Sequence, residues 1–118
     1  MMEEREHILT LGFATVHVRM TRIGNDRLIT VEGGTKPHIG CVVMAVPRPS
    51  LTGAGTVSCT SSVLNVTGHK DEYLCRALAE KAAVRYSCTA VCCGGVHLDH
   101  ITEDQIRQLT QAVEQIEL

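Results

Sequence analysis

Polar and apolar residues alternate along the first third of the chain, a pattern that is typical of half-buried β-strands. The alternation over 14–21 has a period of two and predicts a strand. A second alternation over 28–32 follows the turn sequence Gly-Asn-Asp at 24–26, so the two strands are expected to form a hairpin. Gly12 and Phe13 break the alternation upstream, and we expect a bulge or bend there.

The middle of the chain predicts two further strands. Residues 39–46 form an almost continuous apolar run, which indicates a central strand buried on both faces. Residues 47–56 contain two prolines and two glycines and are expected to form a loop, and a strand rich in Thr, Ser and Val follows over 56–66. Short connections favour a four-stranded antiparallel meander.

The apolar period changes in the last third of the chain. Apolar residues at helical spacing predict an amphipathic helix over 71–85, and a short apolar run over 88–93 predicts a buried strand. Thr102 and Gln105 have the spacing of a capping box at the start of a closing helix. The expected fold is therefore α+β, with the order β-β-β-β-α-β-α and both helices on one face of the sheet.

Composition narrows the class of protein. The chain has 118 residues, so we expect a single domain over 1–118 with a polar N-terminal lead over 1–7. There is no Trp, one Phe and two Tyr against a hydrophobic fraction of 44%, so the core must be aliphatic. An aliphatic sheet face can also be buried against a second copy, and we expect a homo-oligomer.

Charge and cysteine placement exclude several functions. A net charge of -2 with mixed signs argues against binding to nucleic acid or to a membrane surface. No apolar run approaches the length of a membrane span, and the polar start does not resemble a secretory signal. The six cysteines lie mostly in apolar runs and show no zinc-finger spacing. These features predict a reduced, cytoplasmic protein.

Three glycine-containing segments carry the candidate chemistry. The first, GGTKPHIG over 33–40, places Lys36 and His38 beside two consecutive glycines, whose backbone N–H groups can form an anion-binding nest. Pro37 stiffens the approach to His38, which precedes the apolar run at the rim of the predicted sheet. The alternative is a glycine turn with a surface lysine and an edge histidine.

The second segment, VTGHKDE over 66–72, ends a strand at Gly68 and opens the first helix. His69 and Lys70 stand at the helix N-terminus, where free N–H groups and a partial positive charge suit a phosphate or a carboxylate. In the alternative interpretation, Asp71 caps the helix and the two basic residues are solvated.

The third segment, CCGGVHLDHITEDQ, leaves the buried strand at Gly94 and Gly95 and then presents His97, Asp99 and His100. In an extended stretch His97 and Asp99 share a face, and imidazole with carboxylate is a common ligand pair for Zn, Mn, Fe or Ni. The same pair can transfer a proton, or a simple Asp–His hydrogen bond can close the strand-to-helix turn.

Taken together, the three segments favour one shared site. Each lies at a strand end, carries glycine and sets polar groups beside an apolar run. The start of the third strand, the end of the fourth and the end of a fifth strand parallel to the fourth can meet at one rim. We expect a cleft with His38, His69, His97 and Asp99 over glycine backbone.

These motifs resemble those of the LpdD-like prenylated-flavin chaperones over residues 8–117. GGTKPHIG leads into a strand, GHKDE opens a helix, and GGVHLDHITEDQI closes the chain, in the order of that family. The resemblance implies a fold similar to the small proteasome-assembly chaperones. It implies a non-catalytic protein that binds prenylated FMN, or FMN, and supports maturation of a UbiD-like decarboxylase of (hydroxy)aromatic acids.

The resemblance also implies which residues bind the cofactor. These are Gly33, Gly34, Lys36, Pro37, His38, Gly40, Gly68, His69, Lys70, Gly95, His97 and Asp99, with Asp71 and Glu72 completing the second motif. A divalent metal ion that bridges to the phosphate would be held by His38, His69, His97, Asp99 and His100. His100 departs from the family, which more usually has Asn at this position, so its role stays open.

Two other functions compete with the cofactor chaperone. A small metal-dependent hydrolase or lyase would use the His/Asp cluster as ligands, but no general acid or nucleophile lies beside the cluster in sequence. A purely structural decarboxylase subunit would need none of the histidines. No Gly-x-Gly-x-x-Gly fingerprint occurs, which excludes a Rossmann-type binding mode.

Overall fold

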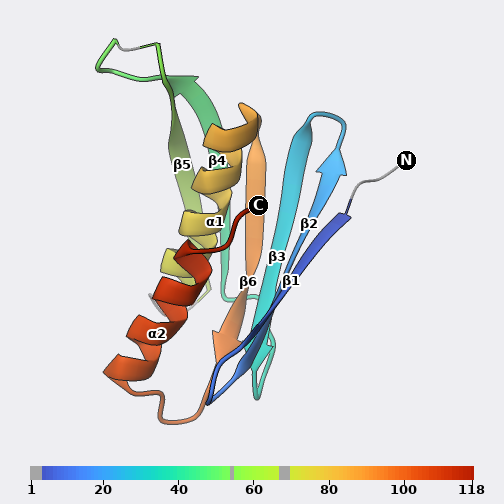
Figure 1. Ribbon diagram of the computed structural model, residues 1–118, viewed down its shortest axis with the longest axis vertical. Helices are drawn as coiled ribbons and strands as arrows, with labels where there is room; N and C mark the ends of the chain where they lie inside the picture. The colour runs from blue at the N-terminus through green and yellow to red at the C-terminus, as the bar shows by residue number, and fades with distance from the viewer. Residues whose placement is uncertain (1–3, 54, 67–69) are drawn as a thin grey trace.

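Six strands form a mixed sheet with two helices in the computed structural model, which describes residues 4–53, 55–66 and 70–118 (Figure 1). The strands are β1 (Glu4–Thr10), β2 (Thr15–Ile23), β3 (Asp26–Gly34), β4 (Cys41–Pro49), β5 (Val57–Asn65) and β6 (Ala90–His97). Helix α1 spans Lys70–Tyr86 and helix α2 spans Glu103–Glu114. The strand order across the sheet is β1-β2-β3-β6-β4-β5.

The predicted four-stranded meander is wrong at its centre. Strand β6 lies between β3 and β4, parallel to β3 and antiparallel to β4, so β3 and β4 do not pair. The physical reason is burial, because β6 is the shortest and most buried of these central strands and gains most from two neighbours. The expectation that this strand runs parallel to the strand over 56–66 is confirmed, since both are antiparallel to β4.

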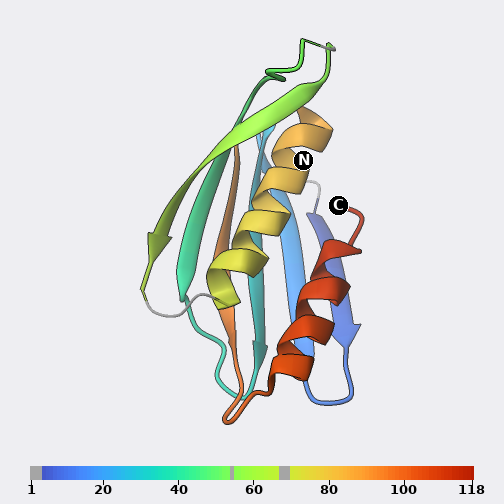
Figure 2. The same ribbon diagram turned by 90° about the vertical axis from the view of Figure 1, so that its left-hand side faces the viewer.

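Both helices cover the same face of the sheet, as predicted (Figure 2). Helix α1 packs on β4, β5, β6 and β3, and α2 packs beside α1. The core between the layers is aliphatic, with the largest fully buried side chains at Ile29, Leu74, Leu78, Leu109 and Leu118. All six cysteines are free thiols, and four of them are buried in this core.

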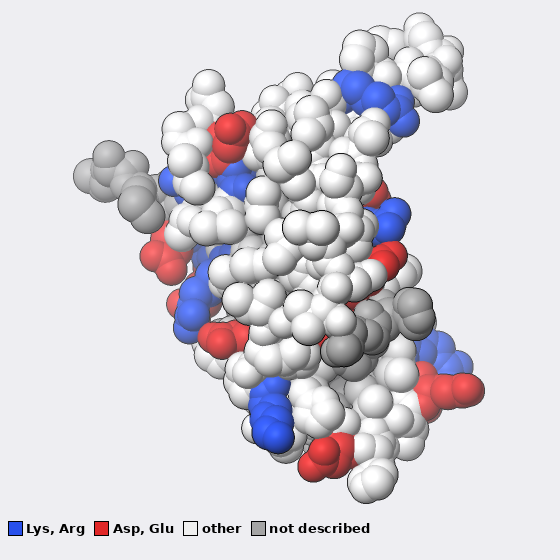
Figure 3. All heavy atoms as spheres, turned by 180° about the vertical axis from the view of Figure 1, so that it is seen from behind, with Lys and Arg blue, Asp and Glu red and all other residues white. Residues whose placement is uncertain are grey.

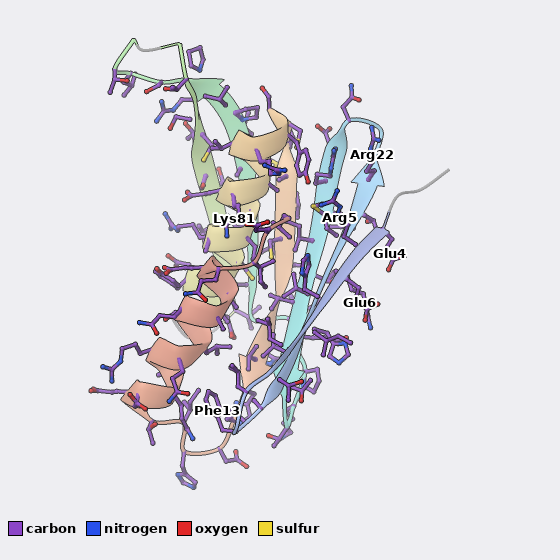
Figure 4. All side chains as sticks on the ribbon, viewed as in Figure 1. Glu4, Arg5, Glu6, Phe13, Arg22 and Lys81 are labelled. Carbon is purple, nitrogen blue, oxygen red and sulfur yellow. The ribbon has the colours of Figure 1, made fainter. Side chains whose placement is uncertain are left out.

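The part of the predicted polar lead that the structure describes is a strand. Residues 4–7 belong to β1, an edge strand that pairs with β2 along its whole length. Glu4 and Glu6 lie on the side of β1 turned away from the helices (Figure 4). Charged side chains on an exposed edge strand disfavour pairing with another strand. The polar residues at the start of the chain are therefore explained by the edge position of β1.

The break at Gly12 and Phe13 is a bend, and it connects two strands. Leu11 and Ala14 exchange backbone hydrogen bonds across it, with the Leu11 N–H donating at 2.8 Å. Phe13 packs against the core from this connection and is labelled near the start of α2 in Figure 4.

Strand β4 is not buried on both faces. Cys41, Val43 and Ala45 are fully buried, but Met44 and Val46 remain 43% and 42% exposed. The helices cover one face only, so a continuous apolar run here still leaves alternate side chains open to solvent. The strand also starts later and runs further than predicted, to Pro49, which shortens the loop to Ser50–Thr56.

The two helices agree with their predicted positions. The capping box is confirmed, since the Gln105 N–H donates to the Thr102 hydroxyl at 3.1 Å and the Thr102 N–H donates to Gln105 Oε1 at 3.0 Å. Lys81 of α1 donates to the carbonyl oxygen of Ile116 at 2.6 Å and so holds the C-terminal segment (Figure 4). Neither helix has the length and hydrophobicity of a membrane span.

Candidate functional site

The first and third segments meet at one end of the sheet. Strand β3 ends at Gly34 beside His97, the last residue of β6, and the Thr35 N–H donates to the His97 carbonyl oxygen at 2.8 Å. The chain then passes over the end of β6 and enters β4 at Cys41, opposite Gly94. We call residues 33–40 and 94–99, together with Asp71, the His38 rim.

Asp71 joins the start of α1 to both segments of this rim. Its side chain is only 4% exposed. One carboxylate oxygen, Oδ1, accepts the Val96 N–H at 3.0 Å, and the other, Oδ2, lies 3.1 Å from Nε2 of His38. At Val96, β6 extends past the residues that pair with β4. The Asp71 carboxylate therefore accepts the hydrogen bond that a neighbouring strand would otherwise accept, since buried polar groups need a partner.

His38 is held at both of its ring nitrogens. Nδ1 lies 3.0 Å from the carbonyl oxygen of Lys36, and a carbonyl oxygen only accepts, so Nδ1 donates. Nε2 lies 3.1 Å from Oδ2 of Asp71, so the second ring nitrogen also has a polar partner. With both nitrogens engaged in this way, a ligand meets His38 through its ring face and its C–H edge.

Glycines at the rim permit this close approach. A Cβ atom at Gly40 would lie 2.3 Å from Oδ2 of Asp71, and one at Gly95 would lie 2.9 Å from both Oδ2 and the His38 ring. Gly34 has a φ of +79°, and a Cβ there would lie 2.0 Å from the His97 carbonyl oxygen. The glycines at these positions therefore let strands and side chains approach each other, and the expected anion-binding nest at Gly33 and Gly34 stays a prediction.

His97 lies next to His38 and makes its own carboxylate contact. The ring centroids of the two histidines are 6.2 Å apart, with an interplanar angle of 82°. His97 Nε2 lies 3.1 Å from Oδ1 of Asp99, and the two side chains are 45% and 80% exposed. An exposed pair of this kind contributes little to stability, so its groups remain available to a ligand.

A cavity of about 310 Å³ opens beside His38 on the sheet face that the helices leave uncovered. Pro37, His38 and Ile39 form one wall, and Cys93 and Gly94 of β6 form its floor together with Thr30, Val31 and Glu32 of β3 and Arg19 of β2. A second cavity of about 540 Å³ lies at the far end of the sheet, around Pro47–Pro49 and Ser87, and contains none of the predicted site residues.

The structure thus brings together most of the predicted cofactor-binding residues. Gly33, Gly34, Lys36, Pro37, His38, Gly40, Gly95, His97 and Asp99 all belong to the His38 rim. Gly68 and His69 lie outside the described residues, and so does the side chain of Lys70, the first residue of α1. His100 occupies an exposed turn with a positive φ of 58°.

Asp71 is the functional residue that sequence reasoning undervalued. The sequence offered it as a helix cap or as part of the second motif, and the structure shows that its side chain contacts both His38 and β6. The sequence does show an acidic residue directly after the His-Lys pair. It could not show which groups this residue contacts, because those contacts depend on β6 crossing beneath α1.

Metal binding and nucleophilic chemistry find no further support at the rim. Among the residues that the structure describes, no group of three or more His, Cys, Asp or Glu side chains is arranged to hold a metal ion. The two thiols that adjoin the rim are weak nucleophiles, because burial, with a smaller effect from Cys75, raises the pKa of Cys41 to about 12 and also raises the pKa of Cys93. The metal set that includes His69 and His100 stays a prediction.

Comparison with known proteins identifies the class that this fold and rim define. Residues 11–117 match the family described as the prenylated flavin chaperone LpdD-like domain, and the chain belongs to this family. Protein LpdD of Lactiplantibacillus plantarum is 40% identical over 89 residues, which cover 71% of this chain and 58% of that protein. The chain therefore matches less than two thirds of the length of this relative.

The fold is also similar to that of a proteasome-assembly chaperone. A chain in the crystal structure of a chaperone complex for yeast 20S proteasome assembly superposes with a TM-score of 0.58 over 97% of this chain and 90% of that one. The sequence identity is 10%, so the likeness concerns the fold alone. The predicted likeness to this fold is confirmed, with the difference in strand order described above.

Proposed function

We propose that this protein binds prenylated FMN, or FMN, at the His38 rim and supports maturation of a UbiD-like decarboxylase without catalysing a reaction itself. Membership of the LpdD-like family supports the chaperone role. The observation that carries the proposal is the meeting of His38 and His97, with ring centroids 6.2 Å apart, beside the 310 Å³ cavity.

The groups around the cavity suit a flavin. Its volume lies at the lower end of the range of small-molecule sites, about 300–1,000 Å³. Pro37, Ile39 and Cys93 offer an apolar surface to a flat ring, and the glycine backbone at Gly94 offers a floor without a side chain. The isoalloxazine ring would lie along this surface, with the face or C–H edge of His38 against it.

The phosphate of the cofactor needs cationic and N–H partners. Lys36 is exposed in the rim three residues after Gly33, and its charge is available to a phosphate. Arg19 is less available, because its guanidinium lies 3.3 Å from Glu32 and 3.8 Å from Glu6. We therefore assign the phosphate to Lys36 and to the start of α1, where helix N–H groups favour an anion.

The side chains at the rim favour binding over catalysis. Both nitrogens of His38 are engaged in hydrogen bonds, and the buried carboxylate of Asp71 accepts from the backbone of β6. A general base must reach the proton that it abstracts, and neither group is free to do so without breaking contacts that hold the rim together.

Co-expression with a flavin prenyltransferase tests the proposal. The purified protein should be coloured and should release a flavin on denaturation. His38→Ala and His97→Ala should each raise the dissociation constant for the flavin at least about tenfold, the loss of one good contact of about 1.4 kcal/mol, and should lower the amount of flavin that co-purifies. Far-UV circular dichroism checks that each variant is folded.

His17→Ala is the matched control. His17 lies on the same sheet face and its side chain is 36% exposed, as is that of His38, but it contacts Glu6 and does not line the cavity. It should retain the flavin. The proposed function would be refuted by a wild-type protein that is colourless and shows no binding of FMN or its prenylated form in calorimetry.

A further inference from the structure

The cavity beside His38 changes character from one side to the other. Strand register places Arg19, Thr30 and Cys93 side by side on β2, β3 and β6, and all three line the cavity. The same row continues to Val42 of β4 and Leu64 of β5. The β2–β3 side of the cavity is therefore polar and charged, whereas the β6 side adjoins apolar residues.

The polar side offers hydrogen-bond donors and acceptors together. Arg19 donates to Oε1 of Glu32 at 3.3 Å, and Thr30 adds a hydroxyl group. A guanidinium has more N–H donors than this contact uses, and a carboxylate has further lone pairs. The pyrimidine edge of a flavin carries carbonyl oxygens and an N–H group, so these side chains suit it. FMN and prenylated FMN share this edge, and the polar side therefore does not distinguish them.

The apolar side is built around Ile39. Its side chain is 61% exposed and lines the cavity together with Cys93. Burial raises the pKa of Cys93, so its thiol stays neutral and acts as a small apolar group. Seen from behind, the middle of the surface that the structure describes carries no Lys, Arg, Asp or Glu, and the charged residues lie at its flanks (Figure 3). Exposed apolar residues that gather in this way mark a binding surface.

The backbone around Ile39 is held in place on both sides. His38 precedes it and has a polar partner at each ring nitrogen. Gly40 follows it, donates its N–H to the carbonyl oxygen of Gly94 and accepts the N–H of Val66, both at 2.9 Å. The fixed backbone presents the Ile39 side chain to the cavity, and a group that is fixed before binding loses less entropy when a ligand contacts it.

We propose that Ile39, together with Cys93, makes this site selective for prenylated FMN over FMN. The proposal rests on the flavin binding proposed above and adds the residues that recognise the prenyl group. Prenylation adds an isoprenoid unit, which has no polar atom, to the isoalloxazine ring. With the pyrimidine edge at Arg19, Thr30 and Glu32, this unit contacts the apolar side and buries apolar surface on both partners. FMN lacks the unit and leaves the same side chains in water.

The expected selectivity is modest, because the contact is only partly enclosed. One methylene group in a hydrophobic pocket is worth about 10–200-fold in discrimination. Ile39 is 61% exposed at the edge of the cavity, so it covers only part of the added group. We therefore expect a preference near the lower limit, with a dissociation constant about tenfold lower for prenylated FMN than for FMN.

Isothermal titration calorimetry with FMN and with prenylated FMN tests the proposal on Ile39→Thr. The substitution keeps a β-branched side chain but places a hydroxyl group at the apolar side. The dissociation constant for prenylated FMN should rise about tenfold, whereas that for FMN should stay within about twofold of wild type. Ile23→Thr is the matched control, because Ile23 is 63% exposed at the end of β2 and does not line the cavity. It should bind both flavins as wild type does.

Glu32→Gln tests the polar side. The glutamine keeps a hydrogen-bonding group of similar size, and an ion pair whose side chains are 43% and 44% exposed contributes little to stability. The dissociation constants for both flavins should rise by the same factor, so that the preference between them is unchanged. A changed preference would place the prenyl group at Glu32 and overturn the proposal.

The two flavins separate failure of the selectivity from failure of the proposed function. A wild-type protein that binds neither flavin refutes the proposed function, and the selectivity with it. Equal affinity of wild type for both flavins, or an Ile39→Thr variant that retains the wild-type preference, overturns the selectivity and leaves flavin binding standing. If Ile39→Thr fails to fold, Cys93→Ser takes its place, because serine fits the same space and is more polar. In that case an unchanged preference in Cys93→Ser overturns the proposal.

Discussion

Asp71 shows how one buried side chain ties distant segments into a site. Its carboxylate is 4% exposed and contacts β6 through the Val96 N–H and the first segment through His38. A buried carboxylate is costly unless hydrogen bonds compensate for the lost water. The rim and the fold therefore depend on the same contacts, and a change at Asp71 should affect both.

Replacing Asp71 should cost more stability than replacing a similar exposed acid. Asp71→Ala should lower the free energy of unfolding by about 2–4 kcal/mol, because the Val96 N–H and His38 lose their charged acceptor. Asp71→Asn retains an acceptor and should cost about half as much. Asp104→Ala is the control, since this first-turn acid of α2 is 66% exposed and should cost less than about 1 kcal/mol. Urea unfolding measures all three, and equal losses at Asp71 and Asp104 would contradict the argument.

The buried thiols predict a loss of stability in alkaline solution. Burial raises the pKa of Cys41 to about 12 from an ordinary 9.0, and burial raises the pKa of Cys88 and Cys92 as well. The unfolded chain therefore releases these protons first as the pH rises. The stabilisation is complete below pH 9.0 and is lost progressively towards pH 12, by up to about 1.4 kcal/mol per pH unit for each thiol.

Urea unfolding near pH 8 and near pH 10 measures this dependence. Cys41→Ala should lower stability at the lower pH, because it leaves a small cavity, and should show a smaller further loss at the higher pH. If wild type and Cys41→Ala lose equal stability between the two conditions, the titration of Cys41 does not contribute.

At the scale of elements, the end of β6 determines where the rim forms. The strand was predicted to end at Cys93, but it continues to His97. Gly95 therefore lies within the strand, next to His38 and Asp71. Local pattern could not show this. Glycine pairs lower strand propensity, and the extension depends on the parallel pairing of β6 with β3 up to Gly34.

Gly95→Ala should therefore damage the rim while leaving the sheet intact. The added Cβ would lie 2.9 Å from Oδ2 of Asp71 and from the His38 ring, and this ring can move away. We expect a loss of about 1–2 kcal/mol in the free energy of unfolding together with a loss of bound flavin. The control is Gly12→Ala, because among the described residues, apart from the two chain neighbours, no heavy atom lies within 4 Å of a Cβ at that position. Unchanged flavin retention in Gly95→Ala would separate His38 from the binding site.

The sequence predicts features that depend on neighbouring residues better than features that depend on contacts between distant segments. The strands from β2 onward, the helix over 71–85 and the capping box at Thr102 follow from local periodicity and are confirmed within a few residues, whereas β1 was not predicted. The position of β6 between β3 and β4 follows from burial against α1 and is invisible to periodicity. The meeting of His38 with His97 was predicted from strand ends, and it holds because both strands that flank β6 bring their ends to this rim.

At the scale of the whole molecule, one sheet serves two surfaces. The face under α1 and α2 carries the aliphatic core, and the opposite face carries the cavity beside His38 and the exposed residues of β4 and β5. The proposed function requires this cavity to hold a cofactor and to release it to a client, and its position outside the core allows both without opening the packed layers.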